Sequence, residues 1–295
     1  MIEKYYDGAI EQVAAGLGTV EKNHLLVRYS GQFSVENLND TKQLEKNEDI
    51  FVQVHEFETG EITCAYEPYL TMICDGFRRY MTGTFEEFME TCDVYYLHRP
   101  VLLGYFNQDN TGREEIILLD EVAYEQERML AALERMLCAI ADRHPVLFVL
   151  NRFQLASKST MQLTARFLKC ENCNIGLVLG VSDVQAMPEF LVPDWEMLYE
   201  TLDDGSKIYH IGNSGRKKEE TIDDEKYVDY GSEKVYRKLQ NMVEFLDFDQ
   251  AAYYLETIER KIKFDNLLVD DAARFRMWLL FVKVSILRQD IPKAL

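Results

Sequence analysis

A run of apolar residues in the middle of the chain places the strongest constraint on its fold. Residues 146–150 read VLFVL, the pattern of a strand that is buried on both faces. Residues 157–168 follow with apolar side chains at helical spacing, and Ser157 stands in the capping position. A strand that needs cover on both faces belongs in a parallel sheet with helices on either side. The segment therefore predicts an α/β domain.

Strands and helices alternate along the first 212 residues. Four further segments have the composition of strands: residues 24–30, 49–57, 174–182 and 206–212. The predicted helices cover residues 2–16, 34–45, 67–80, 84–91, 121–143, 157–168 and 195–202. Thr84 and Glu87 form a capping-box pattern, whereas residues 97–112 are rich in turn residues and are predicted to be a loop or a mixed region. We therefore expect residues 1–212 to form a parallel five-stranded sheet flanked by helices.

The rest of the chain is predicted to be all-α. Residues 213–232 are polar and charged and form the expected linker, and residues 233–295 form the expected helical segment. A weak repeat lies there, because LDFDQAA at Leu246 is matched by QDIPKAL at Gln289, 43 residues later. Each copy follows an apolar helix, which is typical of tetratricopeptide-like hairpins, although their consensus period is roughly 34 residues. A last helix starts at the end of the chain without a neighbour, so we expect a truncated array within a larger protein.

Composition limits the partners that the chain can bind. It has 295 residues and a formal charge of −19, with 32 Lys and Arg against 51 Asp and Glu. Such a surface repels phosphate backbones and anionic lipid, so no direct nucleic acid and no membrane are expected as partners. No apolar run reaches the roughly 20 residues that span a bilayer, and the N-terminus lacks the apolar core of a signal peptide. We therefore expect a cytoplasmic location and leave the oligomeric state open.

The cysteines and histidines predict no metal site. Cys170 and Cys173 form a lone CxxC, and no second pair has the spacing of a zinc site. The pair lies between a helix and a strand, whereas redox chemistry favours the start of a helix. Two unreactive thiols are therefore predicted. The five histidines are scattered and form no i, i+4 pair, so none is predicted to be a ligand or a general base.

Three segments carry a resemblance to a known family. Residues 67–80, EPYLTMICDGFRRY, are similar to a PY-x-P-x-x-x-x-L segment; residues 125–150 are similar to an Arg-containing helix leading into a Walker B strand; and residues 174–183 are similar to a sensor strand. Together they resemble the STAND class of P-loop ATPases, a signalling branch of the AAA-like superfamily. In large LuxR-type regulators this ATPase is followed by tetratricopeptide repeats. The resemblance implies a P-loop NTPase-like sheet with a nucleotide cleft at its strand ends.

The motifs that bind and hydrolyse nucleotide are degenerate in this chain. A Walker A loop needs several glycines, a lysine and a Ser or Thr, but residues 29–40 read YSGQFSVENLND, with Gly31 as their only glycine and no lysine. Where the Walker B motif of the family ends in two carboxylates, Asn151 and Arg152 stand instead. An amide is a poor Mg²⁺ ligand, and a guanidinium cannot accept a proton. The sensor strand ends at Ser182 without the usual arginine.

These departures predict a pseudo-ATPase. The resemblance places a degenerate nucleotide cleft at Gly31, Gln32, Ser34, Asn151, Arg152 and Ser182. We predict no catalytic residue and no cofactor there, because nucleotide binding and its chemistry are both impaired. The expected function is signal transduction through a protein partner of the helical repeats, within a larger transcriptional regulator. An alternative is a STAND switch that binds ATP and Mg²⁺ through a non-standard phosphate loop, and a third possibility is another small molecule in the old cleft.

Overall fold

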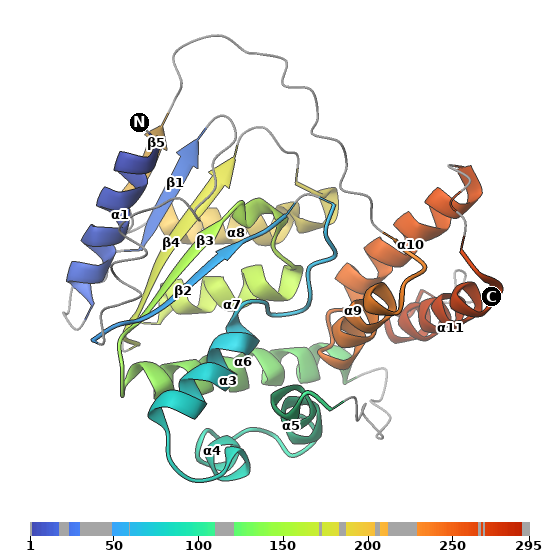
Figure 1. The fold of residues 1–295 in the computed structure, drawn as a ribbon, viewed down its shortest axis with the longest axis horizontal. Coiled ribbons are helices and arrows are strands. Elements are labelled where there is room, and N and C mark those ends of the chain that lie inside the picture. Colours follow the sequence, from blue (N-terminus) through green and yellow to red (C-terminus); the bar gives the residue numbers. More distant parts are fainter. Residues whose placement is uncertain are drawn as a thin grey trace.

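The computed structural model consists of an α/β part built on a parallel sheet and a helical part beside it (Figure 1). It describes residues 2–17, 24–29, 49–58, 60–109, 121–170, 173–182, 187–203, 207–211, 229–264, 267 and 269–290. For residues 2–6, 203 and 207–211 it describes the backbone alone.

The sheet is parallel throughout, and its strands follow the order β2-β3-β4-β1-β5. The strands are β1 (Leu25–Tyr29), β2 (Phe51–Glu56), β3 (Val146–Asn151), β4 (Ile175–Ser182) and β5 (Lys207–Ile211). Every residue of β3 and β4 is buried, because these strands lie at the centre with helices over both faces. In the strand register, Tyr29 lies beside Ser182 and Glu56 lies beside Asn151. The carboxyl ends of β1 to β4 therefore meet at one edge of the sheet.

The predicted five-stranded sheet has to be corrected. The sheet that contributes described side chains to the core has four strands, all parallel, in the order β2-β3-β4-β1. β5 pairs with the outer edge of β1 through its backbone, with Lys207 opposite Leu25, and adds no described side chain to this core. The composition of residues 206–212 favours extended backbone, but strand propensity does not show how far a strand takes part in the core. The mixed α/β class itself holds, since ten α-helices accompany the parallel strands in the described parts of the chain.

One face of the sheet is covered by α1 (Ile2–Gly16), which Figure 1 shows alongside β1. Ile10 and Val13 of this helix are buried against the apolar side chains of β1, β3 and β4. The helix approaches β4 closely at Gly176, where a Cβ would lie 2.5 Å from Cγ1 of Val13. A glycine at this position therefore sets the distance between the helix and the sheet.

The opposite face is covered by α3 (Tyr69–Tyr80), α6 (Val122–Ala141) and α7 (Lys158–Lys169), and α8 (Val192–Asp203) packs against α7. Tyr69 is fully buried there. Its ring contacts that of Phe148 in β3 with centroids 4.7 Å apart, and its hydroxyl hydrogen-bonds Thr164 of α7 at 2.6 Å. This contact joins α3, β3 and α7 in one core.

Two short helices follow α3. α4 (Phe85–Thr91) begins with the predicted capping box: the Thr84 hydroxyl accepts from the backbone N–H of Glu87, and the Glu87 carboxylate accepts from that of Thr84. The prediction for residues 97–112 was incomplete, because α5 (Arg99–Asn107) is helical. Pro100 stands in its first turn, where proline is well tolerated, and Val101 and Leu102 are buried. The turn residues that dominated the prediction lie at and beyond its end.

The helical part contains α9 (Glu233–Glu244), α10 (Phe248–Phe264) and α11 (Asp271–Leu287). Leu246 and Gln289, 43 residues apart, both have left-handed backbone, with φ of 67° and 59°. The N–H after each residue bonds back to a carbonyl five residues earlier at 2.8 Å: Asp247 to Met242 and Asp290 to Ser285. The two repeats noticed in the sequence therefore share one turn geometry.

The helical part docks on the amino-terminal end of α7. Asp247 is buried, and its Oδ2 accepts from the backbone N–H of Ser159 at 3.0 Å, while its Oδ1 accepts from that of Gln250 at 3.4 Å. One carboxylate thus serves N–H groups at the starts of both α7 and α10. Beside it, Lys158 forms an ion pair with Asp249. These contacts tie the helical part to the sheet domain.

Two further expectations concern membrane-spanning helices and the domain boundaries. No helix in the parts of the chain that it describes is long and apolar enough to cross a membrane. The predicted linker at 213–232 lies almost entirely outside the described residues, so the domain boundaries at 212 and 233 stay predictions.

Candidate functional site

The carboxyl edge of the parallel sheet carries a cluster of polar side chains. Six residues form it, and we call them the strand-edge cluster: Tyr29, Glu56, Asn151, Arg152, Gln154 and Ser182. They come from the ends of β1, β2, β3 and β4 and from the turn after β3. β1 lies between β4 and β5, so chain connections leave this point in opposite directions. Such a reversal is where open parallel sheets place their ligand crevice.

The centre of the cluster is a hydrogen bond between β1 and β3. The Tyr29 hydroxyl donates to Oδ1 of Asn151 at 2.7 Å, and both side chains are fully buried. Burial raises the pKa of Tyr29 to about 12, although Arg152 and the bond to Asn151 act in the other direction. The tyrosine therefore stays protonated and remains a donor. The Asn151 amide at the end of β3 is thus engaged by β1, which lies on the other side of β4.

Arg152 makes a sharp turn at the end of β3. Its φ of 52° is in the left-handed region, which is uncommon for residues other than glycine. Its Nε lies 3.4 Å from Oε1 of Glu56 at the end of β2, and both side chains are partly buried. The guanidinium therefore stands beside a carboxylate rather than replacing one, and the local charge of the pair is balanced.

Gln154 joins the ends of β3 and β4. It lies in the 3₁₀ turn Phe153–Leu155 and is buried. Its Nε2 donates to the carbonyl of Ser182 at 3.2 Å, and its Oε1 accepts from the N–H of Ser182 at 3.3 Å. The side-chain amide thus pairs with one backbone unit as a neighbouring strand would.

The structure brings together half of the predicted cleft. Asn151, Arg152 and Ser182 all belong to the strand-edge cluster, as their strand-end positions implied. Gly31, Gln32 and Ser34 lie outside the described residues. Tyr29, Glu56 and Gln154 were not predicted as site residues. Tyr29 and Glu56 could have been found as the last residues of their strands, and Gln154 as a polar residue three positions after the end of β3.

The strand-edge cluster is better suited to structure than to hydrolysis. Its one carboxylate, Glu56, is beside Arg152, and its central amide accepts a hydrogen bond from a tyrosine. A Mg²⁺ site needs oxygen ligands with at least one carboxylate directed at the ion, and hydrolysis needs a base within reach of water. The described side chains of the cluster direct their polar atoms at one another instead.

A second cluster lies at the opposite, amino-terminal edge of the sheet. Cys138 of α6 comes together with Cys170 and Cys173, and the three sulfur atoms all lie within 4.8 Å of one another. Hydrogen bonds with Cys173 and Cys170 lower the pKa of Cys138 against the effect of burial. The prediction of two isolated thiols was incomplete, because the third cysteine is 32 residues from Cys170 in the sequence.

No protein-family model matches the chain, and no curated protein matches it either. The resemblance to STAND ATPases therefore stays a prediction, carried by the sequence motifs quoted for it.

Proposed function

We propose that this chain is a non-catalytic regulatory module of cytoplasmic signalling. In this proposal a degenerate STAND-type ATPase domain holds a tetratricopeptide-like helical part, which recognises a protein partner within a larger transcriptional regulator. The observation that carries the proposal is that the described polar side chains at the carboxyl edge of the sheet contact one another. There the strand-edge cluster satisfies its own polar groups through the Tyr29–Asn151 bond and the contacts of Arg152 and Gln154.

The helical part offers a surface for such a partner. α11 carries apolar side chains on more than one side, with Arg274, Arg276 and Lys283 between them, yet only one side of it packs on the other helices. Three large side chains on it are exposed, Phe275 by 59%, Trp278 by 56% and Leu279 by 48%. A monomer seldom exposes such a group of neighbouring apolar side chains unless it binds something.

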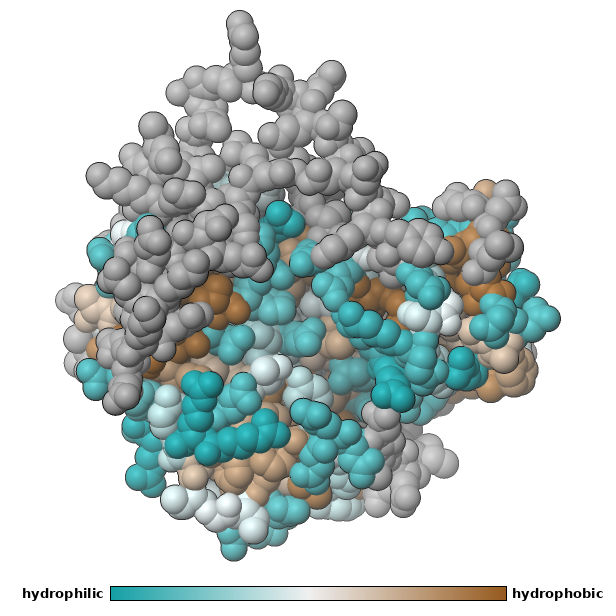
Figure 2. All heavy atoms as spheres, in the orientation of Figure 1, coloured by the Kyte–Doolittle hydropathy of each residue, from teal (hydrophilic) through white to brown (hydrophobic). Residues whose placement is uncertain are grey.

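A groove between α10 and α11 continues this surface. It has a volume of about 440 Å³, and its lining includes Leu255, Ile258, Met277 and Trp278 with Glu256 at its side. Brown apolar surface shows on this part of the molecule in Figure 2. A groove of this kind accepts the apolar face of an amphipathic helix. The lining carries two carboxylates, Glu256 and Glu259, against one guanidinium, Arg274, which favours a helix with basic residues beside that face.

The two parts are linked by a short, continuous path. Asn151 lies in the strand-edge cluster, and eight residues later Ser159 donates its backbone N–H to Asp247 at the start of the helical part. The sheet edge and the helical part are therefore joined by eight residues of chain and one buried hydrogen bond. Coupling between the two parts belongs to the proposal.

Calorimetry with nucleotides tests the first half of the proposal. The purified chain is titrated with Mg²⁺-ATP and with Mg²⁺-ADP, and we expect no saturable binding at millimolar nucleotide. A micromolar affinity that Gly31→Glu abolishes would overturn the proposal and favour the ATP-binding switch with a non-standard phosphate loop.

Substitution on α11 tests the second half. Phe275→Ala is compared with Tyr96→Ala, a control in the sheet domain whose side chain is also 59% exposed. Partners are identified by cross-linking in the cells that produce the protein and are then purified for direct binding measurements. We expect Phe275→Ala to weaken binding by about tenfold or more and Tyr96→Ala to leave it unchanged. Equal affinities for both variants would place the partner elsewhere.

A further inference from the structure

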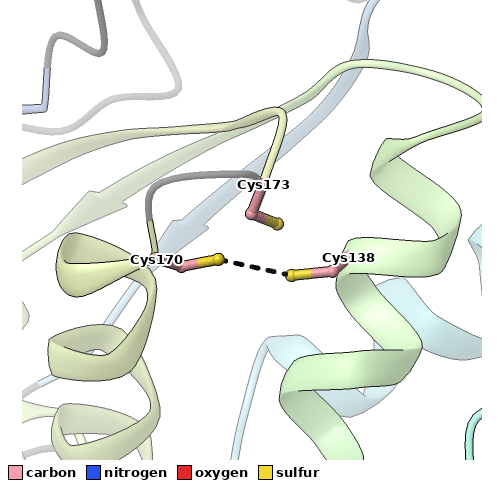
Figure 3. Close-up of side chains that lie close together, drawn as sticks. All are labelled: Cys138, Cys170 and Cys173. Atoms are coloured by element: carbon pink, nitrogen blue, oxygen red, sulfur yellow. Dashed lines mark hydrogen bonds between the residues drawn. The ribbon is translucent and has the colours of Figure 1, made fainter.

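Three cysteines from separate elements converge beside the amino-terminal end of β4. In Figure 3, Cys138 projects from α6 toward Cys170, which follows the last residue of α7, and Cys173 points into the same space from the segment before β4. The Sγ atoms of Cys138 and Cys170 are 3.9 Å apart, and all three sulfur atoms lie within 4.8 Å of one another.

The surrounding fold holds these positions. α6 and α7 pack side by side on one face of the sheet, and β4 is paired with β3 from Ile175 onward. Arg166 of α7 reinforces the contact through ion pairs with Glu127 and Glu134 of α6. Cys138 stands on α6, Cys170 directly follows α7, and Cys173 lies two residues before β4, so the packed helix pair and the central strand bring the three residues together.

The spacing of the sulfur atoms fits a metal ion better than a disulfide. Zinc–thiolate bonds of about 2.3 Å in a tetrahedron separate neighbouring sulfur atoms by about 3.8 Å. The distance of 3.9 Å between Cys138 and Cys170 agrees with that edge, and small rotations bring the third sulfur to it. A disulfide needs its sulfur atoms about 2.05 Å apart, so the same pair would have to close by nearly half.

We propose that Cys138, Cys170 and Cys173 bind Zn²⁺, with three protein ligands and a fourth position open to water or to an external ligand. Each thiol gives up its proton to solvent as it binds, and the metal keeps its oxidation state, so that no oxidant or reductant takes part. The site lies at the opposite edge of the sheet from the strand-edge cluster and does not depend on the proposed function.

The surface beside Cys170 gives the ion a way in. A depression of about 510 Å³ adjoins this residue, and Glu134, Arg166 and Met197 also line it. The carboxylates of Glu134 and Asp142 lie near Cys138, and Glu134 is paired there with Arg166. The depression also provides space for an exchangeable fourth ligand, which sites with three protein ligands use.

Cobalt substitution tests the proposal directly. The reduced, metal-free chain is titrated with Co²⁺ without oxygen, and thiolate-to-cobalt charge transfer and visible d–d absorption are recorded. We expect one equivalent of Co²⁺ to bind with the spectrum of a tetrahedral site rich in sulfur and Zn²⁺ to displace it. Absence of a saturable thiolate band would overturn the proposal.

Serine variants identify the ligands. Cys138→Ser and Cys173→Ser should each weaken binding by about a hundredfold or more, whereas Cys74→Ser, a buried cysteine of α3, should leave it unchanged. Equal effects of all three substitutions would contradict the assignment. Circular dichroism of each variant shows whether its fold is retained.

A protection measurement on the unaltered chain remains decisive if a variant fails to fold. Zn²⁺ should slow alkylation of Cys138, Cys170 and Cys173, read by mass spectrometry, and should not slow that of the partly buried Cys64. Zinc should also prevent a Cys138–Cys170 disulfide under mild oxidation. Equal alkylation with and without zinc would overturn the metal site, and a Cys138–Cys170 disulfide that forms equally in both cases would point to a redox pair instead.

Discussion

The hydrogen bond between Tyr29 and Asn151 gives the sharpest test of the strand-edge cluster. Tyr29→Phe removes a hydroxyl that donates at 2.7 Å between two fully buried side chains. Loss of one partner of a buried hydrogen bond costs about 1–2 kcal/mol of unfolding free energy. The phenyl ring keeps the packing, so the effect reports on the hydroxyl alone. Tyr96→Phe, at a side chain that is 59% exposed, is the control and should change stability by less than about 0.5 kcal/mol.

The pH dependence of the same variant gives a second readout. Burial raises the pKa of Tyr29 from 10.0 to about 12, so the folded state favours the protonated hydroxyl. The stabilisation that comes from this pKa difference is fully present below the pKa of the unfolded chain and is lost as the pH rises through the pKa of the folded one. A difference of two pKa units corresponds to about 3 kcal/mol. The difference in unfolding free energy between the unaltered chain and Tyr29→Phe should therefore shrink as the pH rises above 10.0.

Urea unfolding monitored by circular dichroism, at neutral pH and at a series of alkaline pH values, measures both effects. The linear dependence of the free energy on urea gives the difference between the two proteins, provided that its slope is unchanged. Equal stability at neutral pH would show that the hydroxyl makes no net contribution. A difference that stays constant at alkaline pH would refute the assignment of a buried, protonated Tyr29.

Three further predictions concern the scaffold. Gly176→Ala should destabilise the fold by about 1–3 kcal/mol in urea, because the new methyl group would lie 2.5 Å from Cγ1 of Val13; full stability would mean that α1 moves freely. Asp270→Ala should lower the melting temperature by removing the cap that accepts from the N–H of Ala273 at 2.8 Å, a loss of about 1 kcal/mol. Burial raises the pKa of Asp247 above 3.8, so the folded state favours the protonated acid. The free energy of unfolding therefore falls as the pH rises from that value through the folded pKa. Asp247→Asn should flatten this part of the stability curve in acid-range urea titrations, and an unchanged curve would contradict the assignment.

The central strands could be predicted because an uninterrupted run of apolar residues indicates a strand that is buried on both faces. Residues 146–150 are apolar without interruption, and the structure buries every residue of β3. The number of strands in the core was harder to predict, because the strand propensity of residues 206–212 does not show how far that strand takes part in the core. α5 was missed because the turn residues after Asn107 outweighed the buried Val101 and Leu102.

The site was predicted only where sequence position determines spatial position. Asn151 and Ser182 end adjacent parallel strands, so their proximity follows from the topology. The pairing of Tyr29 with Asn151 depends on strand order, which no local pattern contains. Cys138 escaped notice for a similar reason, because the contact of α6 with the segment before β4 is a tertiary one.

The turns at Leu246 and Gln289 have a geometric consequence for the helical part. Each follows the end of a helix with one left-handed residue and a backward hydrogen bond at 2.8 Å. In repeat arrays, a constant step from one hairpin to the next generates a superhelix of regular pitch. The chain therefore leaves α9 and α11, at positions 43 residues apart, with one shared backbone geometry, the kind of regularity from which such a step is built.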